Sequence, residues 1–98
     1  MPKFITLISY TDEGVQHFKD FEKRMRHARL GAEELGIAID GFYLTMGRHD
    51  AVVVLDAPSA AAVAQLMLTN AANGRIRSET LAAFTEEETA TIAAALPI

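Results

Sequence analysis

One turn of the sequence combines residue types that could carry out acid–base chemistry. His49 and Asp50 follow Gly47 and Arg48. A carboxylate beside an imidazole raises the imidazole pKa and holds its tautomer, which makes His49 a candidate acid–base or ligand residue. The alternative is turn chemistry, in which Gly47 supplies an unusual backbone angle and Asp50 caps free backbone N–H groups. Neighbouring strand residues also point to opposite faces, so the two side chains need not converge.

Four hydroxyl side chains fall in or beside segments with strand character: Thr6, Tyr10, Tyr43 and Thr45. If those strands are neighbours, the hydroxyls could lie together on an apolar floor, which is typical of a small-molecule pocket. Ordinary interface packing is the alternative. Arg77 joins this ligand-binding prediction, because it could clamp a carboxylate bidentately. Pairing with an acidic residue across the sheet is the simpler account of Arg77.

Other kinds of chemistry find little support in the sequence. The chain has no cysteine, which excludes disulfides, thiolate metal sites and cysteine nucleophiles. His17 and His27 point in different directions on a predicted helix, and neither has metal-ligand spacing to a second histidine. No glycine-rich phosphate-binding loop occurs. We therefore predict no metal site, and the sequence names no cofactor.

Charge and length limit the partners of the chain. The chain has 98 residues, with nine Lys and Arg and thirteen Asp and Glu, so its net charge is −4. This balance argues against nucleic-acid binding. The basic run Lys23–Arg29 lacks interleaved aromatic residues and has acidic partners at helical spacing, so we expect a solvated helix face. Without a membrane span or signal peptide, we expect a single cytoplasmic domain over residues 1–98.

The order of the predicted elements indicates the fold. Strand patterns occupy residues 3–10, 37–46, 51–55 and 75–84, and helices are predicted from Thr11 to Gly36 and over about 59–72. A capping box at Thr85–Glu88 opens a short helix that ends at Pro97. This order predicts an α+β, ferredoxin-like βαββαβ fold, with a four-stranded antiparallel sheet, helices on one face and a short C-terminal helix.

The first predicted helix carries one apolar stripe and one polar side. The stripe recurs every three or four residues and consists of Phe18, Phe21, Met25, Ala28, Ala32 and Leu35. Lys23, Arg26, His27 and Glu34 are predicted to point away from it. The stripe is therefore expected to face the sheet.

The face of the sheet that the helices leave open is also predicted to be apolar. Strands 3–10 and 51–55 present Ile, Leu, Phe or Val on both sides. Full burial of such a side chain contributes roughly 1.5–3 kcal/mol, so we expect a second copy to cover this face. In the alternative, the C-terminal helix folds across the face with Ile92 and Leu96.

The hairpin segment Phe42–Asp50, followed by a valine-rich strand and Asp-Ala-Pro, resembles the GYD domain family. The helix entry Thr11–Gly14, the strand Arg75–Leu81 and the segment Ala83–Glu88 extend the resemblance over roughly residues 2–90. His49 stands where the signature usually has tyrosine, so a role requiring a phenol does not carry over. The resemblance implies a ferredoxin-like fold similar to dimeric α+β barrel proteins, and no particular reaction.

The sequence leaves three functions open. The leading hypothesis is a homo-oligomeric module that binds a small, partly apolar molecule between sheet and helices, without strong catalytic machinery. The second is a dimeric-barrel enzyme, either a cofactor-poor oxygenase or isomerase or a heme-handling protein, using His49 or His17 with Tyr43 or Tyr10. The third is a structural or regulatory assembly module, supported by Leu30 and Leu68 on outer helix faces.

Overall fold

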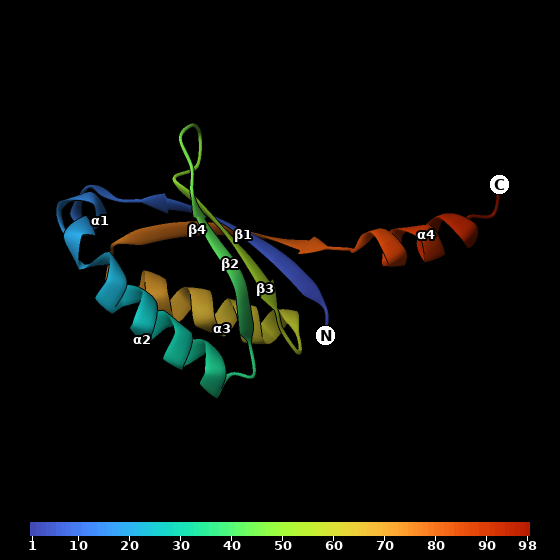
Figure 1. Ribbon diagram of the computed structural model, residues 1–98, viewed down its shortest axis with the longest axis horizontal. Coiled ribbons are helices and arrows are strands. Elements are labelled where there is room, and N and C mark those ends of the chain that lie inside the picture. The colour runs from blue at the N-terminus through green and yellow to red at the C-terminus, as the bar shows by residue number, and fades with distance from the viewer.

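Four antiparallel strands form one sheet in the computed structural model, which describes all of residues 1–98 (Figure 1). The strands are β1 (Lys3–Tyr10), β2 (Ala38–Leu44), β3 (Ala51–Asp56) and β4 (Ile76–Ala83). Their order across the sheet is β2-β3-β1-β4. β1 and β3 are therefore central and run antiparallel, which confirms the predicted ferredoxin-like arrangement.

The helices lie on one face of the sheet, apart from the last (Figure 1). They are α1 (Asp12–Gln16), α2 (Phe21–Glu34), α3 (Ala60–Ala71) and α4 (Glu86–Ala94), with a 3₁₀ turn η1 (Phe18–Asp20) between α1 and α2. The helix starts predicted at Thr11 and near residue 59 are confirmed. The Thr11 hydroxyl caps α1 by accepting a hydrogen bond from the Gly14 N–H, and the Ser59 hydroxyl caps α3 by accepting one from the Ala62 N–H. The prediction of one unbroken helix after Thr11 is wrong, because the chain leaves helical geometry at His17. No helix is both long enough and apolar enough to cross a membrane.

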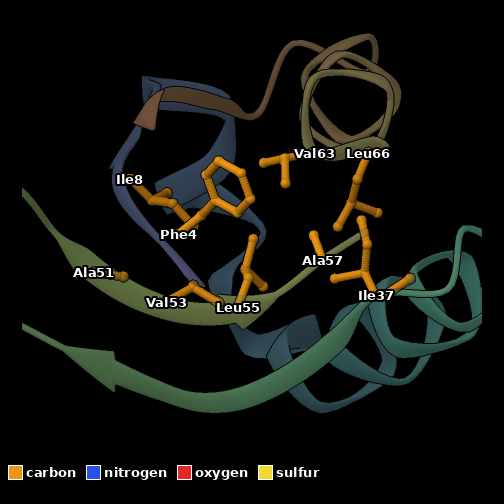
Figure 2. Packing of buried hydrophobic residues seen from close by; sticks show 10 residues of the cluster. Phe4, Ile8, Ile37, Ala51, Val53, Leu55, Ala57, Val63 and Leu66 are labelled. Carbon is orange, nitrogen blue, oxygen red and sulfur yellow. The ribbon is translucent and has the colours of Figure 1, made fainter. Parts of the chain in front are cut away.

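The core lies between this sheet face and the helices. Alternate residues of the two central strands point into it, as period-two geometry requires: Phe4, Thr6 and Ile8 from β1, and Ala51, Val53 and Leu55 from β3. Val63 and Leu66 of α3 close the core from above (Figure 2).

The opposite face of the sheet carries a second apolar surface, which we call the open face. Its residues are Ile5, Leu7, Val52, Val54, Leu81 and Tyr43. No helix covers it. Lys3 lies at one margin and forms ion pairs with Asp40 at 2.8 Å and Asp56 at 2.9 Å. An apolar centre with a charged margin is the composition of an interface core and rim.

The C-terminal helix does not cover the open face. α4 extends away from the body, and every one of its residues is exposed (Figure 1). The radius of gyration is 15.0 Å, whereas a compact chain of this length has about 13 Å. The predicted capping box is present, with the Thr85 side chain and the Glu88 side chain each accepting the other's backbone N–H. The alternative in which this helix folds across its own sheet is therefore not adopted.

The β2–β3 hairpin is irregular at two of its glycines. The pairing register shifts between Ile39 and Gly41, as at a β-bulge. A Cβ atom at Gly41 would lie 3.0 Å from the ring of Tyr43, so the ring packs over the glycine. Gly47 has a φ of +148°, and it lies in the turn that returns the chain to β3.

Candidate functional site

A cavity of about 430 Å³ lies between the helices and the covered face of the sheet. Most of its lining residues are hydrophobic, and they come from β1, β2, β3, α2 and α3. Phe18, Phe21, Met25, Ala28 and Leu35 of the predicted stripe are among them. The stripe therefore faces the sheet as predicted, and it does so without filling the space completely. The volume falls in the range of about 300–1,000 Å³ that is common for ligand pockets.

Aromatic rings form a continuous row along one wall of this cavity. Tyr10 meets Phe18 edge to face at 5.1 Å between ring centroids, and Phe18 lies 5.6 Å from Phe21. Phe21 in turn lies 4.9 Å from Phe42 of β2. These separations are typical of favourable aromatic pairs. The row links β1 to β2 through η1 and α2, and it offers an apolar surface to a ligand.

Arg75 lines the same cavity from the segment just before β4. Its Nε and Nη1 atoms are shielded from solvent and have no hydrogen-bond partner in the protein. The backbone of Arg75 is held on both sides, because its N–H donates to Asn73 Oδ1 at 3.0 Å and its carbonyl accepts the Thr11 N–H at 3.0 Å. Gly14 makes this approach possible, since a Cβ atom there would overlap the carbonyl oxygen of Arg75. The segment is thus fixed while its guanidinium remains unpaired.

Further polar side chains reach the cavity from the helices. His17 Nδ1–H donates to the carbonyl of Glu13 at 2.9 Å, because a carbonyl can only accept, and Nε2 is left free. Arg24, His27 and Glu34 also line the cavity. His27 and Glu34 were predicted to point away from the apolar stripe. Both residues are exposed, and they also border the cavity, because long side chains at the margin of α2 reach over its rim.

The four hydroxyl side chains that were predicted to lie together do not form one cluster. Tyr10 lines the cavity, where burial raises the pKa of its hydroxyl and the nearby Asp50 carboxylate adds to the rise. Thr6 points to the same side but is fully buried, and its Oγ1 lies 3.0 Å from Thr80 Oγ1. Tyr43 is on the open face and 61% exposed. Tyr43 lies on the opposite face from Thr6 and Tyr10, because successive side chains of a strand point to opposite faces of the sheet.

The turn before β3 uses its polar groups for backbone contacts. Thr45 Oγ1 donates to the carbonyl of His49 at 2.7 Å, and Asp50 Oδ2 accepts the Tyr10 N–H at 2.8 Å. This is the capping role that turn chemistry predicts for Asp50. His49 Nδ1 is enclosed and has no partner, and no hydrogen bond joins His49 to the Asp50 side chain. The histidine and carboxylate therefore do not form an acid–base pair here.

The arginine at the cavity is not the one that the sequence suggested. Arg77 pairs with Ser9 across the sheet, lies on the open face and is exposed, with no ion pair. Arg75 lines the cavity instead, although strict alternation would place both on one face. Arg75 lies before the first residue of β4, where Gly74 at φ +79° still directs the chain. That glycine, one residue before an arginine, is the signal that sequence reasoning missed.

Comparisons with known proteins identify relatives of the whole fold. The family model described as "GYD domain" matches residues 4–93. A Thermus thermophilus protein named "Glutamine synthetase and cystathionine beta-lyase binding protein" is 33% identical over 84 residues, covering 85% of this chain and 88% of the relative. The crystal structure of FFRP-DM1 is similar with a TM-score of 0.54 at 15% identity, covering 86% of this chain and all 100% of that one. That likeness shows the fold alone.

The family match spans the hairpin, the helix entry and the closing strand that carried the resemblance in the sequence. The Thermus thermophilus relative adds an independent alignment over most of both chains. This chain therefore belongs to the GYD domain family.

Proposed function

We propose that this protein is a homo-oligomeric binding module that takes a small, partly apolar molecule between its sheet and helices. The observation that carries the proposal is the cavity of about 430 Å³, with its aromatic wall and few polar groups. Such a lining provides apolar burial for a ligand and polar groups that orient it. No metal-ligating cluster accompanies the cavity, and the catalytic pair suggested at the turn is not assembled.

Self-association is the second part of the proposal. The open face leaves Ile5, Leu7, Val52 and Val54 without a covering helix. The projecting α4 adds Ile92, 46% exposed, and is only nine residues long. Isolated helices shorter than about 12–15 residues are marginal in water, so α4 requires a packing partner. A second copy of the chain supplies apolar surfaces of matching kind for both regions.

The assembly is tested by placing a charge at the centre of the open face. Leu7 pairs with Val52 on one side and Glu79 on the other. Sedimentation velocity is expected to give at least a dimer, twice the chain mass of 10.6 kDa, for the unmodified protein. Leu7→Lys is expected to yield monomers, because burying an ammonium in an apolar interface costs desolvation that the neighbouring Glu79 does not repay. A wild-type monomer at all concentrations contradicts the assembly.

The matched control carries the same change on an outer helix face. Leu30 of α2 is 59% exposed and belongs neither to the open face nor to the cavity. Leu30→Lys is expected to leave the assembly unchanged. If Leu30→Lys dissociates the oligomer and Leu7→Lys does not, the copies associate through their helices and the open face is not the interface.

Ligand uptake is tested by filling the cavity. The probe is 4-phenylbutan-1-ol, a neutral molecule with an aromatic end. Titration calorimetry measures its binding. Ala28→Phe adds a ring to the cavity lining, and it is expected to weaken binding at least tenfold. Ala64→Phe, on the exposed side of α3, is the control and should bind as the unmodified protein does. Circular dichroism confirms that both variants fold. No binding by the unmodified protein contradicts the proposal.

A second candidate is recognition of another protein. Leu30 and Leu68, 71% exposed, offer apolar contacts on the outer helices. The name of the Thermus thermophilus relative describes that protein as binding two enzymes. Pull-down with glutamine synthetase and with cystathionine β-lyase, using wild type and Leu30→Lys, tests this candidate. Capture of either enzyme that Leu30→Lys weakens would support it, and the absence of capture would contradict it.

A further inference from the structure

The guanidinium of Arg75 is a partly enclosed cation that the protein leaves without a partner. Nε and Nη1 are shielded from solvent and make no hydrogen bond. Both ion pairs of the chain involve Lys3, so none involves Arg75. Enclosing a charge without a counter-charge is unfavourable, and buried cations are normally paired. A negative group from outside the chain would supply the missing partner, and the cavity that Arg75 lines is the space beside it.

The surroundings of Arg75 hold it in place in advance of binding. Its N–H and its carbonyl are both engaged, by Asn73 and Thr11, and the Thr11 hydroxyl also donates to the carbonyl of Gly74 at 2.7 Å. Gly14 is buried against this segment. A backbone fixed on both sides lowers the entropy lost when the side chain takes up a ligand.

The cavity is also more positive than the rest of the molecule. Arg24 and Arg75 line it against the single carboxylate of Glu34, whereas the whole chain has a net charge of −4. A recess lined by cations attracts anions even though the surface around it is acidic.

We propose that the cavity binds an organic monocarboxylate, with its carboxylate on Arg75 and its apolar body along the aromatic row. This inference rests on the proposed function, because it needs a ligand in the cavity. The planar guanidinium suits a carboxylate, with which it forms paired charge-assisted hydrogen bonds. The mostly hydrophobic lining disfavours a doubly charged phosphate, whose desolvation is more costly.

Two probes with the same skeleton separate the charge from the apolar body. They are 4-phenylbutyrate and 4-phenylbutan-1-ol, which differ only in the head group. Titration calorimetry at neutral pH is expected to show that the unmodified protein binds the carboxylate at least tenfold more tightly than the alcohol. The Nε–H signal of Arg75 in a ¹⁵N-resolved NMR spectrum is expected to move on addition of the carboxylate and to stay in place with the alcohol.

Substitution of the arginine is expected to remove the preference and keep the cavity. Arg75→Gln should weaken the binding of 4-phenylbutyrate at least tenfold. Its affinity for 4-phenylbutan-1-ol should stay within about twofold of that of the unmodified protein, which also shows that the cavity is intact. Arg77→Gln is the matched control, because Arg77 lies two residues away on the opposite face. It removes the same charge and should change neither affinity.

The outcomes distinguish the two proposals. Equal affinities of the unmodified protein for the two probes, with an unmoved Arg75 signal, overturn the carboxylate inference and leave the cavity as a binding site. If Arg75→Gln and Arg77→Gln weaken the binding of 4-phenylbutyrate equally, the carboxylate inference is also overturned, because the effect then comes from net charge. Failure of both probes to bind overturns the proposed function together with this inference.

Discussion

The two faces of the sheet are built from the same strands and the same kinds of residue, yet they have different fates. On the covered face, β3 contributes Val53 and Leu55 to a core closed by α3 (Figure 2). On the open face, the same strand presents Val52 and Val54 to solvent in the single chain. Alternation along a strand explains why both faces are apolar. It also shows that hydrophobicity alone does not say what will cover a face.

The faces differ further in how they treat charge. The open face carries its charges along its margins, where Lys3 is paired with Asp40 and Asp56, and Arg77 and Glu79 lie on the edge strand β4. The covered face partly encloses the unpaired Arg75 beside a cavity. A paired charge at a margin suits a protein interface, and an unpaired charge in a recess suits a small ligand. This difference between the faces supports the proposal that each takes a different kind of partner.

The largest expected effect separates the faces by stability. Leu55 is 0% exposed and Leu81, on the open face, is 44% exposed. Leu55→Ala is expected to lower the free energy of unfolding by about 2–5 kcal/mol, because it leaves a cavity in the core. Leu81→Ala should cost less than about 1 kcal/mol in the monomer. Urea denaturation at low protein concentration measures both. Similar losses would mean that the open face is already closed within one chain.

A smaller effect tests the role of Thr6, which was predicted to bind a ligand. Thr6 Oγ1 lies 3.0 Å from Thr80 Oγ1 and does not line the cavity. Thr6→Val should cost about 0.5–1.5 kcal/mol, the usual net value of a hydrogen bond, and leave 4-phenylbutan-1-ol binding unchanged. Thr80→Val should cost more, because it leaves the buried Thr6 hydroxyl unpaired. Weaker probe binding by Thr6→Val would return Thr6 to the ligand site.

The smallest effect concerns the charges at the margin of the open face. The hydrogen bond from Lys3 lowers the pKa of Asp40, and the bonds to Asp40 and Asp56 raise the pKa of Lys3. The stability from Asp40 is present above its unfolded pKa and is lost as pH falls through the lowered value. The stability from Lys3 is present below its unfolded pKa and is lost as pH rises through the raised value. Both contributions are therefore present at neutral pH.

Lys3→Met is expected to lower the melting temperature only slightly, because exposed ion pairs contribute little. The difference between Lys3→Met and the unmodified protein should be flat around neutral pH and shrink at acid and alkaline extremes. Melting curves across pH, recorded by circular dichroism, measure it. A difference that is largest at acid pH would show that other groups dominate this margin.

Local signals in the sequence were sufficient for most elements. Thr11 and Ser59 begin their helices, Thr85 and Glu88 form the capping box, and Gly41 lies at a bulge. These features depend on neighbours within a few residues, and their backbone geometry follows from residue type. The family resemblance also rested on such local segments. The break at His17 was not predicted, because the helix start at Thr11 and the apolar stripe from Phe18 lie close enough to belong to one helix.

The candidate site was predicted far less well than the fold. Tyr10 does line the cavity, but Tyr43 lies on the other face and Thr6 is sealed in the core. Arg77 was predicted to bind the ligand, but Arg75, just before β4, is the arginine that lines the cavity. Which arginine reaches the cavity depends on the docking of residues 73–75 against Gly14, a contact between distant parts of the chain.

The sequence by itself determined the element order and the apolar character of both sheet faces, because each follows from periodicity and local capping. Only the tertiary structure decided which side of the central strands is covered, that α4 leaves the open face bare, that a cavity remains between α2, α3 and the sheet, and that Arg75 is partly enclosed there without a partner. The physical reason is that these features depend on how distant segments pack, and side-chain alternation and capping do not specify the space left between them.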